Sequence, residues 1–514
     1  MIGSYGVVRP ILVGVLFAIG LGGCQLALDF DDETSPELSG ELPGLFEDRD
    51  DVPLAFNHPD DCKTCHENQY NEWQTSAHAY AMADPVFRAM VKMGQAATEG
   101  KLGQFCVQCH SPTGLATGQS EVFFDDTNNV FDQQLDMDPI AMSGVTCTAC
   151  HTMTQVIEPV NARVVYTPNG ILQGPFENAL PNEFHGSAYN PLFDDSLEDF
   201  GRQCGSCHNV VNPKGALIEQ TFPEFAASSA KAMGKTCVTC HMPEYIGKAS
   251  TGPDAPDGLV DRMVHRHTFA GVDVSLLAPG EFPGDVQMAA IASALLQESV
   301  EFAAVYTSGT MTIDTSITNL AGHAVPSGAT AERQMWIELI VKNTAVPAIE
   351  VFSSGKLTPE GDLRDGILEH NTMSGTDPQL AYYGQVLIAI DGFAAMSTDA
   401  KASARAQIDL DCLPFGQGAT APGSLGRAVE MPWQADWQCD NLVAADAIAV
   451  DNYDMSGLPL GNYTATVRLL YRTFPPFFLR KLEVGGGLDP MVKTRLPIVE
   501  MEATSINFTV APVL

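Results

Sequence analysis

The hydrophobic pattern changes near residue 309, and the two sides of that point predict different kinds of structure. After it, apolar and polar residues alternate or form short β-branched and aromatic runs, which Gly, Pro and Asn residues separate. Runs of this kind are typical of β-strands. We expect strands at or near 311–314, 335–341, 386–390, 463–471 and 506–510. Some 200 residues of short strands without a helical pattern predict an immunoglobulin-like β-sandwich domain over residues 309–514.

Before residue 309 the apolar positions favour helices. In residues 271–308, a Pro-Gly-Asp start signal at 283–285 precedes apolar side chains that recur with helical spacing as far as Phe302. We expect a bridging helix of about five turns there, with its apolar stripe as packing surface. An Asp-Pro start signal at 84–85 predicts a short amphipathic helix. No long strand is evident in residues 56–270, so the predicted class is an α+β multidomain chain.

Residues 1–23 combine a basic residue, a short apolar run and small residues before a cysteine. The apolar run, residues 11–21, is too short to cross a bilayer comfortably, so we interpret the segment as a signal peptide. Its Leu-Gly-Gly-Cys ending resembles a bacterial lipoprotein signal, in which Cys24 becomes the lipidated first residue. The alternative is an ordinary signal peptide with a chance cysteine. Gln25 after the cysteine resembles the pattern of lipoproteins destined for the outer membrane.

Charge narrows the possible partners. Residues 24–55 are acidic and interrupted by Pro and Gly, which predicts a flexible, self-repelling tether. The whole chain has a net charge of −36. This charge argues against binding nucleic acid or bare anionic lipid, because both would repel the protein. Basic or positively patched redox proteins are more plausible partners, although solubility alone would explain much of the charge.

Five copies of the pattern Cys-x-x-Cys-His lie between residues 56 and 270. Two thiols one turn apart can form thioethers to one porphyrin, and the adjacent histidine can then ligate its iron. A zinc knuckle or a dithiol redox pair also uses Cys-x-x-Cys, but neither needs the following histidine, and the chain has 12 histidines in all. The pattern therefore predicts five covalently attached haems c. The motif residues are Cys62, Cys65 and His66; Cys106, Cys109 and His110; Cys147, Cys150 and His151; Cys204, Cys207 and His208; and Cys237, Cys240 and His241.

The cysteine count agrees with an oxidising compartment. Of 13 cysteines, those outside the motifs are Cys24, Cys412 and Cys439, and we predict a disulfide between the last two. Two unpaired thiols are the alternative. About 43 residues for each motif are too few for an ordinary side-chain core. We therefore expect residues 56–270 to form a pentahaem cytochrome domain in which the porphyrins are the core.

Histidines outside the motifs are the candidates for the second axial ligand of each iron. A carrier haem needs two strong axial ligands, whereas a haem that does chemistry needs one open face. Seven free imidazoles suffice for five irons, and any of the 19 methionines could substitute. His370 has only acidic and polar neighbours and is interpreted as a surface residue. The distal candidates are His58, His78, His185, His267 and His323, with His265 as the alternate to His267.

Residues around the motifs form a set that points to a family. The matching segments are the first motif with Tyr70, Trp73, Ser76 and His78, then 144–147, 204–228, 237–243, His267-x-Phe269, 319–328 and 470–476. Together they resemble the exported multihaem c-type cytochromes of the cytochrome c-554-like group. The resemblance implies distal ligands at His78, His267 and His323, with His323 reaching from the β-domain into the haem region. Five motifs, against four or eight in the best-understood members, mean that the order of the haems does not carry over.

The predicted function is electron transfer through five haems, in a membrane-tethered relay in the periplasm or at the cell surface. No motif ends in lysine, a mark of the active-site haem in some reductases, and this favours a carrier. One alternative is an oxidoreductase acting on a small nitrogen or sulfur compound at one open haem. Another is a cytochrome that assembles into filaments or docks to an outer-membrane conduit.

Overall fold

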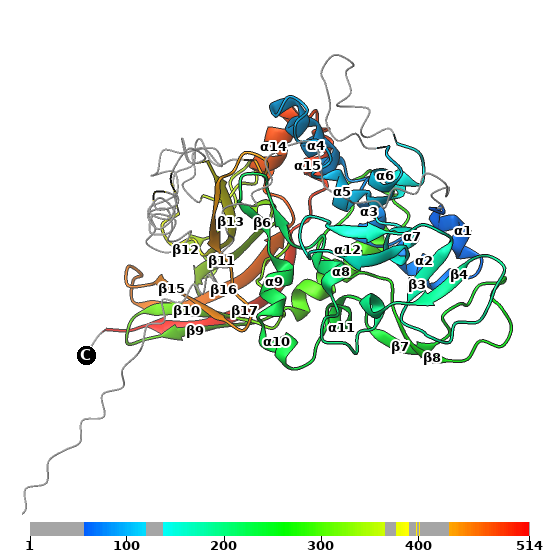
Figure 1. Ribbon diagram of the computed structural model, residues 1–514. Helices are drawn as coiled ribbons and strands as arrows, with labels where there is room; N and C mark the ends of the chain where they lie inside the picture. Colours follow the sequence, from blue (N-terminus) through cyan, green and yellow to red (C-terminus); the bar gives the residue numbers. More distant parts are fainter. Residues whose placement is uncertain are drawn as a thin grey trace, which may run out of the picture. The chain divides into compact units, whose positions relative to one another are not determined.

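Figure 1 shows the computed structural model, which describes residues 56–119, 137–364, 377–389, 397, 400 and 431–512. These residues belong to one compact unit that spans 37–514. The predicted signal peptide, the lipidation site at Cys24, the tether and His370 lie outside the described residues. The predicted disulfide also lies outside them, because Cys412 and the side chain of Cys439 are not described.

Short helices dominate the part of the chain that carries the motifs. Most of them are one or two turns long, since turns and loops interrupt them repeatedly. They are α1 (Pro59–Lys63), α2 (Glu67–Trp73), α3 (Ala77–Tyr80), α4 (Pro85–Ala97), α5 (Val107–His110), α6 (Pro112–Ala116), α7 (Cys147–His151), α8 (Arg202–Gly205), α9 (Thr221–Ala226), α10 (Ser229–Ala232) and α11 (Cys237–His241), with the 3-10 turns η3 (Ala141–Ser143) and η4 (Pro191–Phe193).

Four two-stranded ladders accompany these helices, and the sequence pattern did not reveal them. Their strands have two to four residues, too few for a visible alternation of polar and apolar positions. The pairs are β1 (Met153–Val156) with β2 (Val164–Tyr166), β3 (Ile171–Gly174) with β4 (Gly186–Tyr189), β5 (Val210–Val211) with β6 (Leu217–Glu219), and β7 (Glu244–Gly247) with β8 (Arg262–His265).

The predicted helix after Asp84 is confirmed as α4. The Asp84 side chain accepts a hydrogen bond from the backbone N–H of Val86, and proline occupies the first turn, where no intrahelical N–H partner is needed. One face of the helix, including Val86, Phe87 and Val91, is buried.

The bridging helix is shorter than predicted. It forms α12 (Asp285–Glu298), which buries Met288, Ala292 and Leu296 at helical spacing. Phe302 lies instead in strand β9 (Val300–Thr307), where it pairs with Ile317. The chain leaves the helix at Val300 because its β-branched and aromatic residues find a partner strand there.

Two antiparallel sheets follow. The larger has the strand order β14-β13-β11-β16-β17 with β12 also paired to β11, and the smaller has the order β15-β10-β9. A single hydrophobic cluster includes residues of both sheets, such as Ile313 and Ile337. The remaining strands are β10 (Thr312–Asn319), β11 (Gln334–Asn343), β12 (Glu350–Ser354), β13 (Tyr382–Ile388), β14 (Trp437–Asn441), β15 (Ile448–Asp454), β16 (Gly461–Arg472) and β17 (Val499–Val510), and the turn η5 (Thr330–Glu332) precedes β11.

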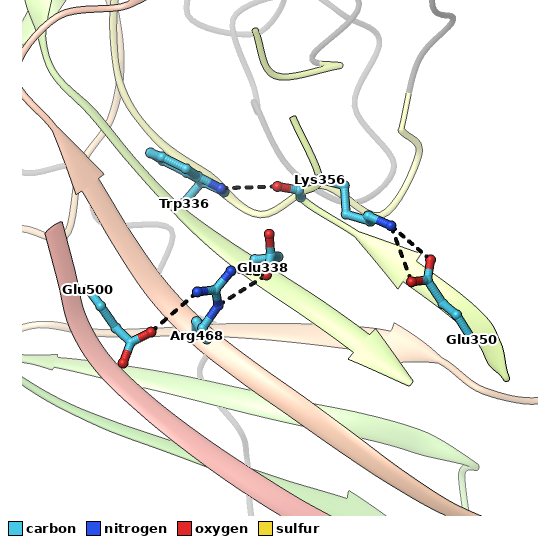
Figure 2. A network of polar contacts seen from close by, with 7 residues as sticks. Trp336, Glu338, Glu350, Lys356, Arg468 and Glu500 are labelled. Atoms are coloured by element: carbon cyan, nitrogen blue, oxygen red, sulfur yellow. Dashed lines mark hydrogen bonds and ion pairs between the residues drawn. The ribbon is translucent and has the colours of Figure 1, made fainter. Parts of the chain in front are cut away.

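Polar contacts reinforce the register of the larger sheet. Arg468 on β16 forms ion pairs with its register partner Glu338 on β11 and with Glu500 on β17 (Figure 2). The Trp336 indole donates to the backbone oxygen of Gly355 at 3.1 Å. Opposite charges across neighbouring strands favour this alignment over a shifted one.

The expectation that residues after 309 contain no helix is wrong. Helix α14 (Pro476–Gly485) begins with proline in its first turn and buries Phe477, Phe478, Leu479 and Leu482, and α15 (Met491–Thr494) follows it. Helix α14 packs against α4 in one shared apolar cluster. The helix has ten residues and starts with a run of adjacent apolar side chains, so the sequence shows no clear helical period. The helix joins the β-rich part to the motif-bearing part.

Candidate functional site

The five Cys-x-x-Cys-His motifs share one local construction. Each lies on or beside a single helical turn, as in α7 and α11, where the whole motif is helical. The backbone N–H of His66 donates to Cys62, and that of His208 donates to Cys204, so the histidine follows one turn after the first thiol. At α7 the Thr146 hydroxyl caps the turn by accepting from the backbone N–H of Ala149.

A cavity of about 1940 Å³ lies between the motifs. All ten motif cysteines and all five motif histidines line it, together with aromatic residues such as Trp73, Phe200 and Phe269. A pocket for one drug-sized ligand has roughly 300–1,000 Å³, so this cavity suits several large planar groups rather than one small molecule. Paired thiols, imidazoles and an apolar wall are the donor set that covalently held haem needs.

Each motif histidine has its Nδ1 fixed by a hydrogen-bond acceptor. The acceptors are backbone oxygens for four of them: Ala249 for His66 (2.8 Å), Ala81 for His110 (3.2 Å), Gln173 for His151 (2.6 Å) and Ala270 for His241. A proton held at Nδ1 leaves the Nε2 lone pair free for a metal. Burial lowers the pKa of these four imidazoles, which favours the neutral form that ligates iron.

The acceptor of His208 is a carboxylate. Its Nδ1 lies 2.9 Å from Oε1 of Glu219, a buried residue on β6. Burial opposes the charged imidazole, but the charge and hydrogen bond of Glu219 prevail and raise the pKa of His208 to about 9. A carboxylate behind a ligating histidine makes the imidazole a stronger donor to the metal. We therefore expect the iron held by His208 to have a lower reduction potential than it would with a backbone acceptor.

Four motif histidines face a second imidazole. Two imidazoles bound at about 2 Å on opposite sides of one metal have their ring centres about 6 Å apart. The observed ring-centre distances are 6.3 Å for His66 with His185, 6.3 Å for His208 with His78, 6.5 Å for His151 with His267, and 6.2 Å for His241 with His323. The spacing in each pair thus fits one haem iron between the two rings.

The second imidazole of each pair is also in a state that suits a metal ligand. Burial lowers the pKa of His78 to about 3 and that of His267 to about 4, so both remain neutral. In three of the distal histidines a backbone oxygen lies within hydrogen-bond distance of Nδ1. These oxygens belong to Gly186 for His185 (2.9 Å), Ala324 for His323 (3.0 Å) and His265 for His267 (3.1 Å). Four of the five distal candidates are thereby brought to motif histidines.

The structure does not bring His58 to a motif histidine. Its Nδ1 accepts from the backbone N–H of Asp60 as the N-cap of α1, and its Nε2 lies 3.4 Å from the Ser143 hydroxyl. His58 does not line the cavity. The structure therefore gives no support to the predicted distal role of His58, whose ring caps α1 instead. His265, the alternate to His267, lies beside two carboxylates instead.

The remaining motif histidine, His110 of the second motif, has different surroundings. Its ring stacks on Phe87 with centres 3.7 Å apart, and within the described ranges no histidine ring pairs with it. Two ionisable residues that the sequence analysis missed, Glu332 and Arg333, line the same cavity, and the charge of Glu332 acts on Cys106 of this motif. Arg333 forms an ion pair with Asp273 at 2.9 Å. Adjacent opposite charges just before an apolar strand were the only signal in the sequence.

Glu332 predicts a pH dependence of stability. Burial raises its pKa to about 8, although Arg333 lowers it. The folded state therefore binds more protons than the unfolded state between the ordinary glutamate pKa of 4.5 and about pH 8, and the free energy of unfolding falls as pH rises through this window. We expect Glu332→Gln to remove most of this fall, which is on the order of a few kcal/mol. Denaturant unfolding at pH 5 and pH 8 measures it, with the exposed Glu360→Gln as control; equal slopes in both variants would contradict the expectation.

Thiols of different motifs lie next to one another, which shows which haem-attachment motifs are neighbours in space. Cys62 lies close to Cys147, Cys204 to Cys237, and Cys109 to Cys207, because in each pair the neighbouring thiol has the largest effect on the pKa of the other. Cys150 and Cys207 are close enough to interact electrostatically. The motifs are therefore adjacent in the order first, third, fourth and fifth, with the second beside the fourth.

Comparisons with known proteins agree with this construction. The sequence model of the family described as Cytochrome c554 and c-prime matches residues 61–152. The fold is similar to that of a penta-haem cytochrome c552 from Thermochromatium tepidum, with a TM-score of 0.55 and 18% identity over 89% of this chain and 100% of that one. No curated protein matches the sequence significantly. The two matches support a multihaem c-type cytochrome family.

Proposed function

We propose that this multihaem c-type cytochrome carries five covalently attached haems and passes electrons along them. The observation that carries the proposal is the set of four imidazole pairs at 6.2–6.5 Å. Two strong ligands on an iron keep its geometry unchanged between the ferric and ferrous states, which suits one-electron transfer. When bound, the haems supply that one-electron chemistry.

The order of the attachment sites supports a relay. The contacts of Cys62 with Cys147, of Cys150 with Cys207, and of Cys204 with Cys237 give a continuous line through four motifs. The second motif adjoins this line at the fourth, through Cys109 and Cys207. The fourth motif is thus the junction of the proposed path.

A count of iron spin states tests the proposal. In the oxidised protein we expect low-spin paramagnetic signals that correspond to the four irons between paired imidazoles. The mass of the mature chain should show five added haems. A high-spin signal that amounts to more than one iron, or a mass with fewer haems, would contradict the relay as described.

A second candidate function rests on His110, which stacks on Phe87 and has no imidazole partner among the described residues. An iron held there with one face open could bind a small nitrogen or sulfur compound, which is an oxidoreductase function. Carbon monoxide added to the reduced protein distinguishes the two cases. One equivalent bound per chain would support the open site, whereas no binding would leave all irons in the carrier role.

The remaining proposals concern location and assembly. We propose that the protein is exported, lipidated at Cys24 and located at the outer membrane. Two features favour this: c-type haems are attached to the chain outside the cytoplasm, and the Leu-Gly-Gly-Cys segment resembles a lipoprotein signal. Among the helices of the described residues, none has the length and apolar character needed to cross a membrane.

A positively patched redox protein is the proposed partner, because the chain carries a net charge of −36. We also propose that the two sheets form a β-sandwich that could serve filament or conduit contacts.

A further inference from the structure

Three side chains from separate segments converge outside the imidazole pairs. Asp195 follows the turn η4, Glu244 begins β7, and His265 ends β8. Glu244 and His265 are direct register partners on the two-stranded ladder. Their ligand atoms and that of Asp195 all lie within 4.8 Å of one another. The Nε2 of His265 is 3.4 Å from Oδ2 of Asp195 and 3.9 Å from Oε1 of Glu244.

The orientation of the His265 imidazole shows that a positive charge is missing from this cluster of three side chains. Nδ1 of His265 is 2.8 Å from the backbone oxygen of Met242, which can only accept, so the ring proton lies at Nδ1. The lone pair of Nε2 then faces two carboxylates. Among the described residues, neither carboxylate has another hydrogen-bond or ion-pair partner. A lone pair and two negative charges at these distances repel unless a positive charge lies between them.

We propose that Asp195, Glu244 and His265 bind a divalent cation of the zinc class. Zinc accepts both imidazole nitrogen and carboxylate oxygen, at about 2.0–2.2 Å. Ligands at that distance in a tetrahedron lie about 3.3 Å apart, close to the 3.4 Å and 3.9 Å that separate Nε2 from the two oxygens. The Met242 oxygen behind the imidazole is the outer partner that metal-binding histidines have. The three side chains border the large cavity, and His265 is mostly buried.

The cation would link two chain segments that both contact His151, the histidine of the third motif. Phe193, two residues before Asp195, stacks on His151 with ring centres 5.4 Å apart. His267, two residues after His265, pairs with His151 at a ring-centre distance of 6.5 Å. A metal bound to Asp195 and His265 therefore fixes the segment that supports His151 to the segment that opposes it. We expect it to hold the spacing of this imidazole pair.

The test uses the full haem-loaded protein after removal of metals with EDTA. Zinc chloride is titrated into it calorimetrically, and bound zinc is counted by mass spectrometry. We expect one tight equivalent in the wild type, and a loss of affinity of at least about tenfold in Asp195→Asn, Glu244→Gln and His265→Gln. Asp199→Asn, an exposed acidic residue four positions from Asp195, is the matched control and should bind as the wild type does.

A second measurement separates this site from zinc bound loosely to the acidic surface. Zinc should change the low-spin paramagnetic signal of one iron in the wild type and in Asp199→Asn, but not in Asp195→Asn. Asp195 lies on a different segment from His267, so this variant keeps the distal side unaltered. If the wild type binds no more zinc than His265→Gln, the three residues do not form a metal site, and the proposal is wrong.

Discussion

Replacing both thiols of the fourth motif, Cys204→Ala with Cys207→Ala, is expected to remove one haem and to divide the electron path. The fourth motif touches three others, through Cys237, Cys109 and Cys150. Without it, the first and third motifs lose their connection to the fifth. After rapid mixing with a reductant, we therefore expect reduction of the haems in three separated kinetic groups (the first and third together, the second, and the fifth), where the wild type shows one connected progression.

The second motif offers a matched control. Cys106→Ala with Cys109→Ala also removes one haem, but this motif lies beside the line rather than within it. The control should lose the same mass and keep the connected progression among the remaining haems. If both double variants showed the same kinetics, the order of motifs proposed here would be wrong, and loss of any one haem would be equivalent.

The chemistry of the site could be predicted from local sequence, because it depends on adjacent residues. A thiol, a second thiol one turn later and a following histidine are fixed by the geometry of a single helical turn, as α7 shows. The pairing of imidazoles could not be predicted in this way. His66 and His185, or His78 and His208, are more than a hundred residues apart, so only the tertiary fold decides which rings meet.

The error at His58 and the missed residues have the same origin. His58 lies four residues before Cys62, which suggested a reach to a neighbouring iron, but Pro59 starts α1 and the ring caps that helix. Glu219 gave no signal, and Glu332 gave only the weak signal of its neighbour Arg333, because the importance of both carboxyls comes from burial beside distant residues. Strand positions in the β-rich part followed the alternation of residues, whereas helix α14 was missed, since its ten residues begin with a run of adjacent apolar side chains and show no clear helical period.

The β-rich part takes a direct part in the site. The Asn212 side chain donates to the backbone oxygens of Pro432 and Ala435, at 2.8 Å and 2.7 Å. Glu224 on α9 accepts from the backbone N–H of Ala324 at 3.0 Å, next to His323. Burial raises the pKa of Glu224 to about 7, so the protonated and ionised forms of this contact are both accessible near neutral pH. The bond between Glu224 and Ala324 holds the loop that presents His323.

His323→Ala is expected to change one iron from low-spin to high-spin and to destabilise the fold. His323 is the one paired imidazole that comes from beyond residue 309, and it faces His241 at 6.2 Å. Its removal opens one face of that iron and also removes one of the links between the β-rich part and the motif-bearing part. We expect the free energy of unfolding to fall by about 1–3 kcal/mol, in line with loss of a buried interaction. Paramagnetic spectra of the oxidised protein and denaturant unfolding measure the two effects.

His58→Ala is the matched control, because it removes an imidazole that faces no motif histidine. It should leave the spin states unchanged and lower stability by about 1 kcal/mol or less, the cost of an ordinary N-cap. Imidazole added from solution should restore the low-spin signal in His323→Ala but not the lost stability, since a free ligand fills the coordination position without joining the two parts. If His323→Ala kept all its low-spin signal, another residue would hold that iron, and the β-rich part would have no role in ligation.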